Sequence, residues 1–487
     1  MVGQATRLAH GLFDPGPLQY WLLALPVHLD PVHGLVWGAA LCCMLAASLT
    51  IEAARAVAGA TGALLASGTV LATVAWMPAV ALQPYWNPWF GVMFLLAALA
   101  AGWAALSGRR GWWPVLVITA SVAAQAHLMF IVVSVGLVLL TFLVGLVDNV
   151  RDQAGYRWAL TGLGAGAVCW IVPVLQEFTA PAGNLTALLR SQGASGGRTG
   201  LAFGLKALAG AVQPPPMWWT PLQSLLDLNL IDKRSAVFGA GTLAVLAAVA
   251  VIAVRPLRSR WLAALGGVSL MASAGSLVAY SGIAVQSIPA MPSSLYTMNY
   301  LMILMLPVGI LAWFAVGGAL GLAVRQIVRH TRAKSAPPRR PEARDRSGGR
   351  AGAGAGSVAR RALPAAGLAA VVSLGLASSL SVQNSWRQFP GVADQQVVRA
   401  VSTASGQIER TLPPQPVALS VVSFDLNYDK RRLLLGLAYV LSTRGYRPEL
   451  GGYGWELGPA YVARGQSDVR VRVVVRGTDV TVKISRP

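Results

Sequence analysis

Long apolar runs separated by short charged loops dominate the chain. Their ranges are 33–54, 61–82, 88–107, 114–147, 158–176, 236–254, 261–281, 297–322 and 362–382. A helix of about 20 apolar residues crosses the roughly 30 Å of hydrocarbon in a bilayer. The pattern therefore predicts an all-α bundle of membrane-spanning helices.

The run 114–147 is too long for one crossing, because a straight helix of that length would measure about 51 Å. Gln125 and His127 interrupt it near the middle. Polar groups at mid-membrane are costly without partners or water. We therefore expect two crossings, 114–125 and 128–147, with both polar residues at the turn between them.

The charged loops test this division of the run. With two crossings, every strongly basic loop falls on one side, as the positive-inside rule requires of the cytoplasmic side. These loops are Arg55, Arg109–Arg110, Arg151 to Arg157, Arg255 to Arg260 and Arg325 to Arg361. The prediction becomes about ten transmembrane helices.

The same reasoning assigns the remaining segments to sides of the membrane. We expect residues 1–32 to form an extracytoplasmic segment. The loop 177–235 is also expected outside the cytoplasm, and it belongs to a transmembrane region that covers 33–322. A basic, disordered cytoplasmic loop covers 323–361, and 362–382 is the last span. Because 1–32 would cross the membrane with no span before it, we expect the natural protein to carry a further span upstream; translocation of a short tail is the alternative.

Composition supports lipid as the solvent, since 55% of the residues are hydrophobic and 12% are charged. A net charge of +21 raises the question of nucleic acid, but 11 of the 39 Lys and Arg residues lie in 325–361 and most others in short loops. Loop charge of this kind is typical of membrane insertion and argues against nucleic-acid binding. The cysteines, at 42, 43 and 169, have neither disulfide nor metal-ligand spacing.

The long apolar runs end before residues 383–487, whose pattern predicts a small extracytoplasmic α/β domain. Helical spacing covers 393–410 and 430–443, and a strand is expected at 417–422. Alternating positions on either side of Gly477 predict a hairpin.

Two outer segments hold the candidate chemistry. In the first, a turn rich in Pro and Gly contains Asp14 and leads into an apolar stretch too short to span, with Tyr20 at headgroup depth in an interfacial helix. Asp before such a turn also caps helices. The second, 172–235, contains Glu177, Asn184 and Arg190 and ends near the pair Trp218 and Trp219, which fit either a ligand cavity or interfacial anchors.

Three segments resemble the integral-membrane glycosyltransferases of the GT-C class, the superfamily of protein mannosyltransferases and aminoarabinose transferases, and most of all a bacterial multi-pass subfamily. Residues 14–24, DPGPLQYWLLA, resemble the family's "His-Pro-Gly-Pro-Leu, aromatic, Leu-Leu-Ala" segment. Residues 121–128, SVAAQAHL, resemble its "Ser…Gln-Thr-His-Leu" turn, and 173–185 its "Pro-Pro…Pro-Gly-Asn-Leu" loop. The likeness covers roughly residues 10–320.

The resemblance implies transfer of a sugar from a polyprenyl-phosphate donor to a cell-envelope acceptor, at the outer face of a bacterial plasma membrane. It implies an acidic residue that acts as base or holds a divalent metal ion, for which Asp14 and Glu177 are the candidates. It also implies a polar donor site, to which Tyr20, Gln125, His127, Asn184, Arg190, Trp218 and Trp219 are assigned. Asp14 stands where the family often has His, and the family's Asp-Glu pair is missing from the sequence. The resemblance therefore leaves an inactive protein as the alternative.

Two other classes of function remain open. A transporter of lipid-linked saccharide would have repeated halves and charged residues at mid-membrane, and neither is evident in the sequence. A non-catalytic binding role would use the C-terminal domain, where Tyr453, Trp455 and Glu456 lie in a segment rich in glycine that is expected to be a loop.

Overall fold

The structure of the protein is a computed structural model. It describes residues 14–30, 34–76, 87–149, 153–179, 183–191, 197–219, 231–254, 257–283, 302–335, 391–423, 427–450, 469–476 and 479–486. These residues form two compact units, a helical unit up to residue 335 and a C-terminal unit from residue 391. Tyr453, Trp455, Glu456 and the expected last span 362–382 lie outside the described residues.

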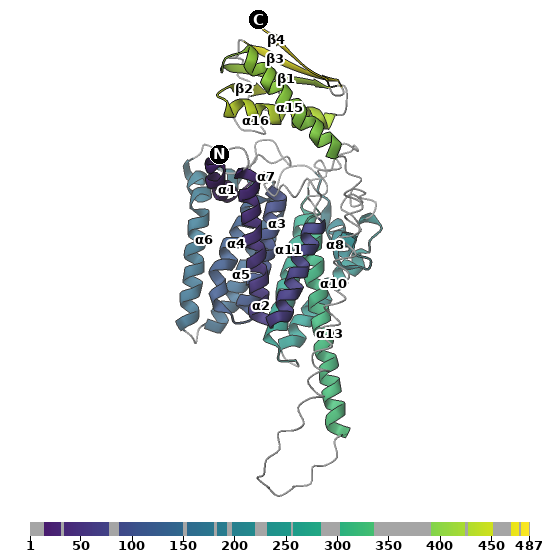
Figure 1. Cartoon of the computed structure of the whole chain (residues 1–487). Coiled ribbons are helices and arrows are strands. Elements are labelled where there is room, and N and C mark those ends of the chain that lie inside the picture. Colours follow the sequence, from purple (N-terminus) through teal and green to yellow (C-terminus); the bar gives the residue numbers. More distant parts are fainter. Residues whose placement is uncertain are drawn as a thin grey trace, which may run out of the picture. The chain divides into compact units, whose positions relative to one another are not determined.

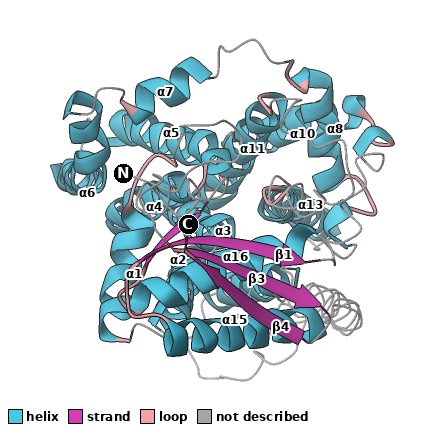
Figure 2. Cartoon of the chain, turned by 90° about the horizontal axis from the view of Figure 1, so that it is seen from above, coloured by secondary structure: helices cyan, strands magenta, loops and turns pink. Residues whose placement is uncertain are grey.

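The helical unit is a bundle of long apolar helices (Figure 1). Its α-helices are α1 (Leu18–Leu29), α2 (Gly34–Trp76), α3 (Asn87–Leu106), α4 (Trp113–Ala126), α5 (Ile131–Asn149), α6 (Gln153–Thr179), α7 (Asn184–Ser191), α8 (Gly200–Val212), α10 (Ala236–Val254), α11 (Arg260–Ser281) and α13 (Met305–Ser335). Short 3-10 turns are η2 (Arg110–Trp112), η3 (Leu128–Phe130) and η4 (Met217–Trp219). Helix α3 lies in the centre of the bundle (Figure 2), with Phe90, Leu95 and Ala97 fully buried.

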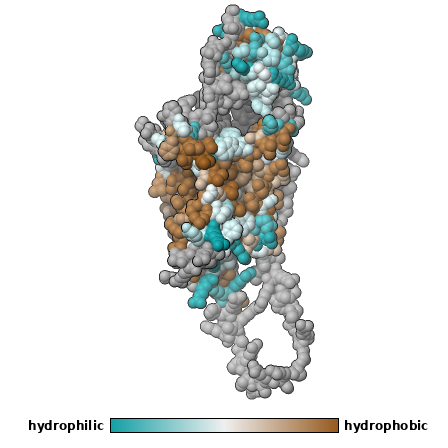
Figure 3. Space-filling model, turned by 90° about the vertical axis from the view of Figure 1, so that its left-hand side faces the viewer, coloured by the Kyte–Doolittle hydropathy of each residue, from teal (hydrophilic) through white to brown (hydrophobic). Residues whose placement is uncertain are grey.

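Large apolar side chains cover the outside of this bundle. Leu143, Val168, Phe178 and Val237 are between 60% and 82% exposed, as lipid-facing residues are. Figure 3 shows the resulting apolar band, with hydrophilic residues along its lower edge. Among the described residues, seven helices are long and apolar enough to cross a membrane: α2, α3, α5 with η3, α6, α10, α11 and α13.

Helix α2 accounts for two of the expected spans. Its helical geometry is interrupted at Ala58 and at Gly59, where φ is 61° and ψ is −145°. Residues that carry a side chain rarely adopt that backbone conformation, so the glycine permits the bend. The two arms of α2 correspond to the expected runs 33–54 and 61–82.

The run 114–147 breaks in the structure where its polar residues predict a turn. Helix α4 ends at Ala126, His127 adopts an extended conformation (φ −158°, ψ 136°), and α5 starts at Ile131. The two helices pack against each other. With 14 residues, α4 is shorter than the seven long helices.

Three described arginines of the basic loops, Arg109, Arg110 and Arg260, lie together at one end of the helical unit. Arg109 donates from Nε to the carbonyl of Ala56 (2.9 Å), and Arg260 donates from Nε to the carbonyl of Leu106 (3.1 Å). Arg110 and Arg260 line a small cavity beside the last turns of α3 and α5. Helix α4 runs from this basic end to the turn at His127, which therefore lies at the opposite end.

The C-terminal unit is a small α/β domain with its own core. Helices α15 (Gly391–Thr411) and α16 (Asn427–Thr443) pack on a four-stranded sheet of order β2-β1-β3-β4. Its strands are β1 (Pro416–Ser423), β2 (Arg447–Leu450), β3 (Arg470–Arg476) and β4 (Asp479–Ser485). Strand β1 is parallel to β2 and β3, and β3 and β4 form the expected antiparallel hairpin.

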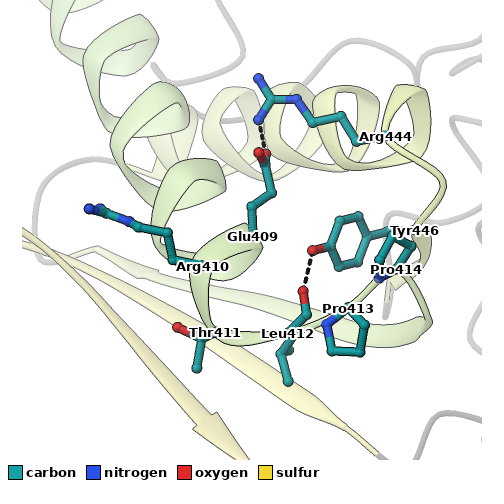
Figure 4. Close-up of a pocket in the computed structure, with 8 residues that line it drawn as sticks. All are labelled: Glu409, Arg410, Thr411, Leu412, Pro413, Pro414, Arg444 and Tyr446. Atoms are coloured by element: carbon teal, nitrogen blue, oxygen red, sulfur yellow. Dashed lines mark hydrogen bonds and ion pairs between the residues drawn. The ribbon is translucent and has the colours of Figure 1, made fainter.

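A hollow of about 480 Å³ lies where α15 and α16 end (Figure 4). Glu409 and Arg444 form an ion pair across it. Tyr446 donates its hydroxyl to the carbonyl of Leu412 (2.6 Å). These contacts join the two helix ends, so the polar groups of the hollow serve the packing of the domain.

Candidate functional site

The three sequence segments that carry the family resemblance meet at the end of the helical unit opposite the basic loops. Asp14 lies just before α1, Gln125 and His127 end α4, and Asn184 begins α7 after the end of α6. More than 150 residues of chain separate Asp14 from Asn184. All four side chains are buried, with Asp14 5%, Gln125 1%, His127 6% and Asn184 6% exposed.

The first contact joins the turn before α1 to α7. Asn184 donates from Nδ2 to the backbone carbonyl of Asp14 (3.3 Å). This bond fixes the Asp14 backbone relative to the loop that follows α6. Asn184 thus links the start of α7 to the turn that carries Asp14.

The second contact joins the same turn to α4. A methyl group at Gly16 would overlap the carboxamide of Gln125, so only glycine lets the turn approach this closely. The glycine of the Pro-Gly-Pro sequence thus has a packing role.

The third contact joins α4 to α6. Gln125 donates from Nε2 to the carbonyl of Cys169 (2.8 Å). Within a helix that carbonyl would accept from the amide four residues later, but residue 173 is proline and has no N–H. Gln125 therefore supplies the donor that Pro173 removes.

A further polar bond lies one turn back along α4. Trp170 donates from Nε1 to Oγ of Ser121 (3.0 Å). Ser121 and Gln125 are four residues apart and so share the face of α4 that packs on α6. Gln125 Oε1 remains buried without a hydrogen-bond partner among the described residues, and it lies against Gly16.

His127 forms the turn itself. Its Nδ1 accepts the backbone N–H of Met129 (3.2 Å), and its ring centroid lies 5.6 Å from that of Phe130. Burial lowers the pKa of His127 to about 4, which keeps the ring neutral near pH 7 and leaves Nδ1 able to accept. The described contacts of His127 thus build the α4–α5 turn.

Glu177 caps α7. Its Oε2 accepts the N–H of Leu185 (2.8 Å) and its Oε1 accepts the N–H of Thr186 (3.0 Å). A carboxylate at a helix N-terminus accepts hydrogen bonds from the free backbone amides and interacts favourably with the helix dipole. A side chain at Gly183 would overlap this carboxylate. Glu177 therefore holds the helix that carries Asn184.

Tyr20 lies on α1, the short helix that the sequence predicts at the interface. It is 43% exposed, and its neighbour Trp21 is 47% exposed. Desolvation first, and the Asp14 carboxylate second, raise the pKa of the Tyr20 phenol. The tyrosine thus stays protonated and lies within electrostatic reach of Asp14.

Trp218 belongs to another part of the bundle. It donates from Nε1 to the carbonyl of Ala211 at the end of α8 (2.8 Å) and packs on Gly309 of α13. Arg234 holds the preceding proline loop through the carbonyls of Gln213 (3.3 Å) and Pro215 (2.9 Å). These contacts place Trp218 on α8 and α13, not on the cluster around Gln125. The side chains of Arg190 and Trp219 lie outside the described part of the chain.

Glu177, one of the two acidic candidates for holding a divalent metal, is engaged in the structure. Both oxygens of Glu177 accept backbone amides. Among the described residues, no three His, Cys, Asp or Glu side chains gather as metal ligands would.

Sequence reasoning missed the roles of Gly16, Ser121 and Pro173, although all three lie within the segments that carry the resemblance. The signal for Pro173 was its place inside an apolar run, where a proline leaves a carbonyl without its helical donor. A polar residue such as Gln125 inside another run is the complementary signal. No sequence rule pairs the two, because the pairing depends on which helices are neighbours.

Comparison with known proteins gave a structural likeness only. No protein-family model and no curated protein matches the sequence. The fold is similar to the crystal structure of ArnT from Cupriavidus metallidurans in the apo state, with 15% sequence identity and a TM-score of 0.45. The alignment covers 95% of this chain and 82% of that chain. The similarity concerns overall fold, and we take the functional inference from the residues described above.

Proposed function

We propose that this chain is a GT-C-like membrane glycosyltransferase that takes a sugar from a polyprenyl phosphate and passes it to a cell-envelope acceptor. The observation that carries the proposal is the meeting of three distant segments, around Asp14, Gln125 and Asn184, in one polar cluster. That cluster lies at the opposite end of the bundle from the basic loops. By the positive-inside rule, this end faces outward from the plasma membrane of a bacterium.

Asp14 is the candidate base. Its carboxylate would take the proton of the acceptor hydroxyl as the oxygen attacks the anomeric carbon. The bond from that carbon to the phosphate oxygen breaks, and the polyprenyl phosphate leaves with the electron pair. Cations stabilise such a leaving group, and Arg190 on α7 is the candidate for this role.

The other cluster residues would position Asp14 and the donor. Asn184 holds the Asp14 backbone, and Glu177 holds the helix of Asn184. Gln125 Oε1 is a buried acceptor beside the Asp14 turn, suited to a sugar hydroxyl. Tyr20 offers a phenol near the Asp14 carboxylate.

Purified chain in proteoliposomes, supplied with a panel of pentoses and hexoses on polyprenyl phosphate, tests the proposal. We expect release of polyprenyl phosphate from at least one donor, and a loss of about 100-fold or more in Asp14→Asn, because general-base catalysis contributes about 10²–10⁴-fold. Asp232→Asn is the matched control. Asp232 pairs with Lys206 (3.0 Å), its side chain is 65% exposed, and its loss should leave the rate unchanged.

Two results would contradict the proposal. An Asp14→Asn variant that keeps the full rate would remove Asp14 as the base. Translocation of the lipid-linked sugar with no glycosidic bond formed or broken would favour a transporter instead.

A further inference from the structure

In the described part of the C-terminal domain, both helices pack on the same face of the sheet. Val417, Leu419, Val471 and Val473 point toward α15 and α16 and are buried in the core of the domain. Successive residues of a strand point to opposite faces. The alternate residues of β1, β3 and β4 therefore form a second face, which the two helices do not cover (Figure 2).

This second face is strongly basic. Arg447, Arg470, Arg472 and Lys483 are exposed, and their side chains share this side of the sheet by strand alternation and register. Arg472 lies directly opposite Lys483. Residues in such a pair have Cα atoms about 5 Å apart, and Arg470 is about 7 Å further along the strand. We call these four residues the basic face.

The residues between these charges are small. Ser420 lies opposite Arg472 on β1, and Thr481 is the neighbour of Lys483 on β4; both are exposed. Glu449, an acid on the same side, is 9% exposed on the outer strand β2. The described residues of this face include no aromatic ring on which a sugar could stack, so its recognition chemistry is cationic.

We propose that the basic face docks the C-terminal domain on the anionic phospholipid headgroups of the membrane that holds this chain. The charge of the face is complementary to such headgroups, and the side chains between its cations are short. Eight residues, 383–390, separate α15 from the expected last span, and they reach at most about 27 Å. A tether this short keeps the lipid surface at high effective concentration.

Because the proposed docking is electrostatic, its strength depends on the number of cationic residues and on the salt concentration. Each Arg or Lys near an anionic surface contributes about five-fold in the docking equilibrium. Neutralising Arg470 and Arg472 together should weaken docking about 25-fold. Salt at 1 M should also abolish it, because the screening length falls to about 3 Å.

The test uses the full chain in nanodiscs, with the native cysteines replaced by alanine. A fluorophore on Ser420→Cys reports the basic face, and lipids with a nitroxide on the headgroup quench it on approach. We expect strong quenching with 30% anionic lipid and little with zwitterionic lipid alone. A fluorophore on Tyr439→Cys, on α16 and 46% exposed, should stay unquenched in both.

Charge variants then separate this face from net charge. The pair Arg470→Gln and Arg472→Gln should lose the quenching of Ser420→Cys. The pair Arg399→Gln and Arg410→Gln removes the same amount of charge from exposed positions of α15. This variant should keep the quenching of Ser420→Cys. Unchanged near-ultraviolet circular dichroism would show that all variants remain folded.

Three outcomes would overturn the proposal. Equal quenching in anionic and zwitterionic nanodiscs would show that headgroup charge is not recognised. Equal loss in both charge pairs would show that net charge, not this face, is responsible. Binding of soluble polyphosphate to the basic face without quenching by anionic lipid would assign the face to a soluble polyanion. None of these outcomes bears on the glycosyltransferase proposal.

Discussion

Gln125 replaces the hydrogen bond that Pro173 removes from α6, and this pairing gives a sharp prediction. Gln125→Met keeps the side-chain volume but removes the donor. The carbonyl of Cys169 then lies buried without a partner, which costs about 1–3 kcal/mol. We expect the free energy of unfolding of the purified protein to fall by about 2 kcal/mol.

The cost depends on the proline. In a Pro173→Ala background, the new N–H can donate to the carbonyl of Cys169 within the helix. Gln125→Met should then cost about 1 kcal/mol less than it does beside proline. Unfolding in detergent, followed by circular dichroism, yields both values, and the double-mutant cycle gives the coupling energy.

Pro26 provides the matched control, since it also lies inside a helix, α1, but its missing N–H has no connection to Cys169. The effects of Gln125→Met and Pro26→Ala on the free energy of unfolding should therefore be additive. Additivity of Gln125→Met with Pro173→Ala, within the error of about 0.5 kcal/mol, would refute the assignment of Gln125 as substitute donor.

Four shorter predictions concern the same end of the bundle and its orientation. Gly16→Ala overlaps a buried carboxamide and should cost about 1–3 kcal/mol in unfolding free energy. Glu177→Gln should speed amide exchange in α7, since loss of a cap costs about 0.5–2 kcal/mol. The pKa of His127 is lowered to about 4, so the unfolded chain binds its proton first; the protein should lose stability as pH falls from about 6.5 to 4, and His127→Asn should flatten this dependence. On intact cells, an impermeant maleimide should label Thr481→Cys and should label Arg258→Cys only after lysis.

Each of these predictions has a control or a contrary result. Gly164→Ala, at an open helical position, should not destabilise the protein. Glu52→Gln, at an exposed ion pair with Arg55, should leave amide exchange in α7 unchanged. A pH dependence that persists in full in His127→Asn would assign it to other groups. Labelling of Arg258→Cys on intact cells would reverse the membrane orientation.

The amino-acid sequence by itself determined the membrane class and the break in the run 114–147. Apolar length predicts the helices, and the polar residues Gln125 and His127 place the turn of 114–147 where the structure has it. The physical reason is that insertion into a lipid bilayer depends on local properties of the chain, apolar length and loop charge, which can be read directly from the sequence. The hairpin of β3 and β4 was likewise predictable, because the alternation and Gly477 are local signals. The four-residue strand β2 was not, because its proline and short length resemble a loop.

Tertiary structure alone decided how the polar residues are used. Glu177 had the chemistry of a catalyst, yet the fold uses both of its oxygens to cap α7. Trp218 was grouped with Gln125, but it packs on α8 and α13. The bond from Gln125 to Cys169 exists only because α4 and α6 are neighbours. A hydrogen bond between distant segments depends on which helices pack together, and apolar runs of similar composition carry little information about their neighbours.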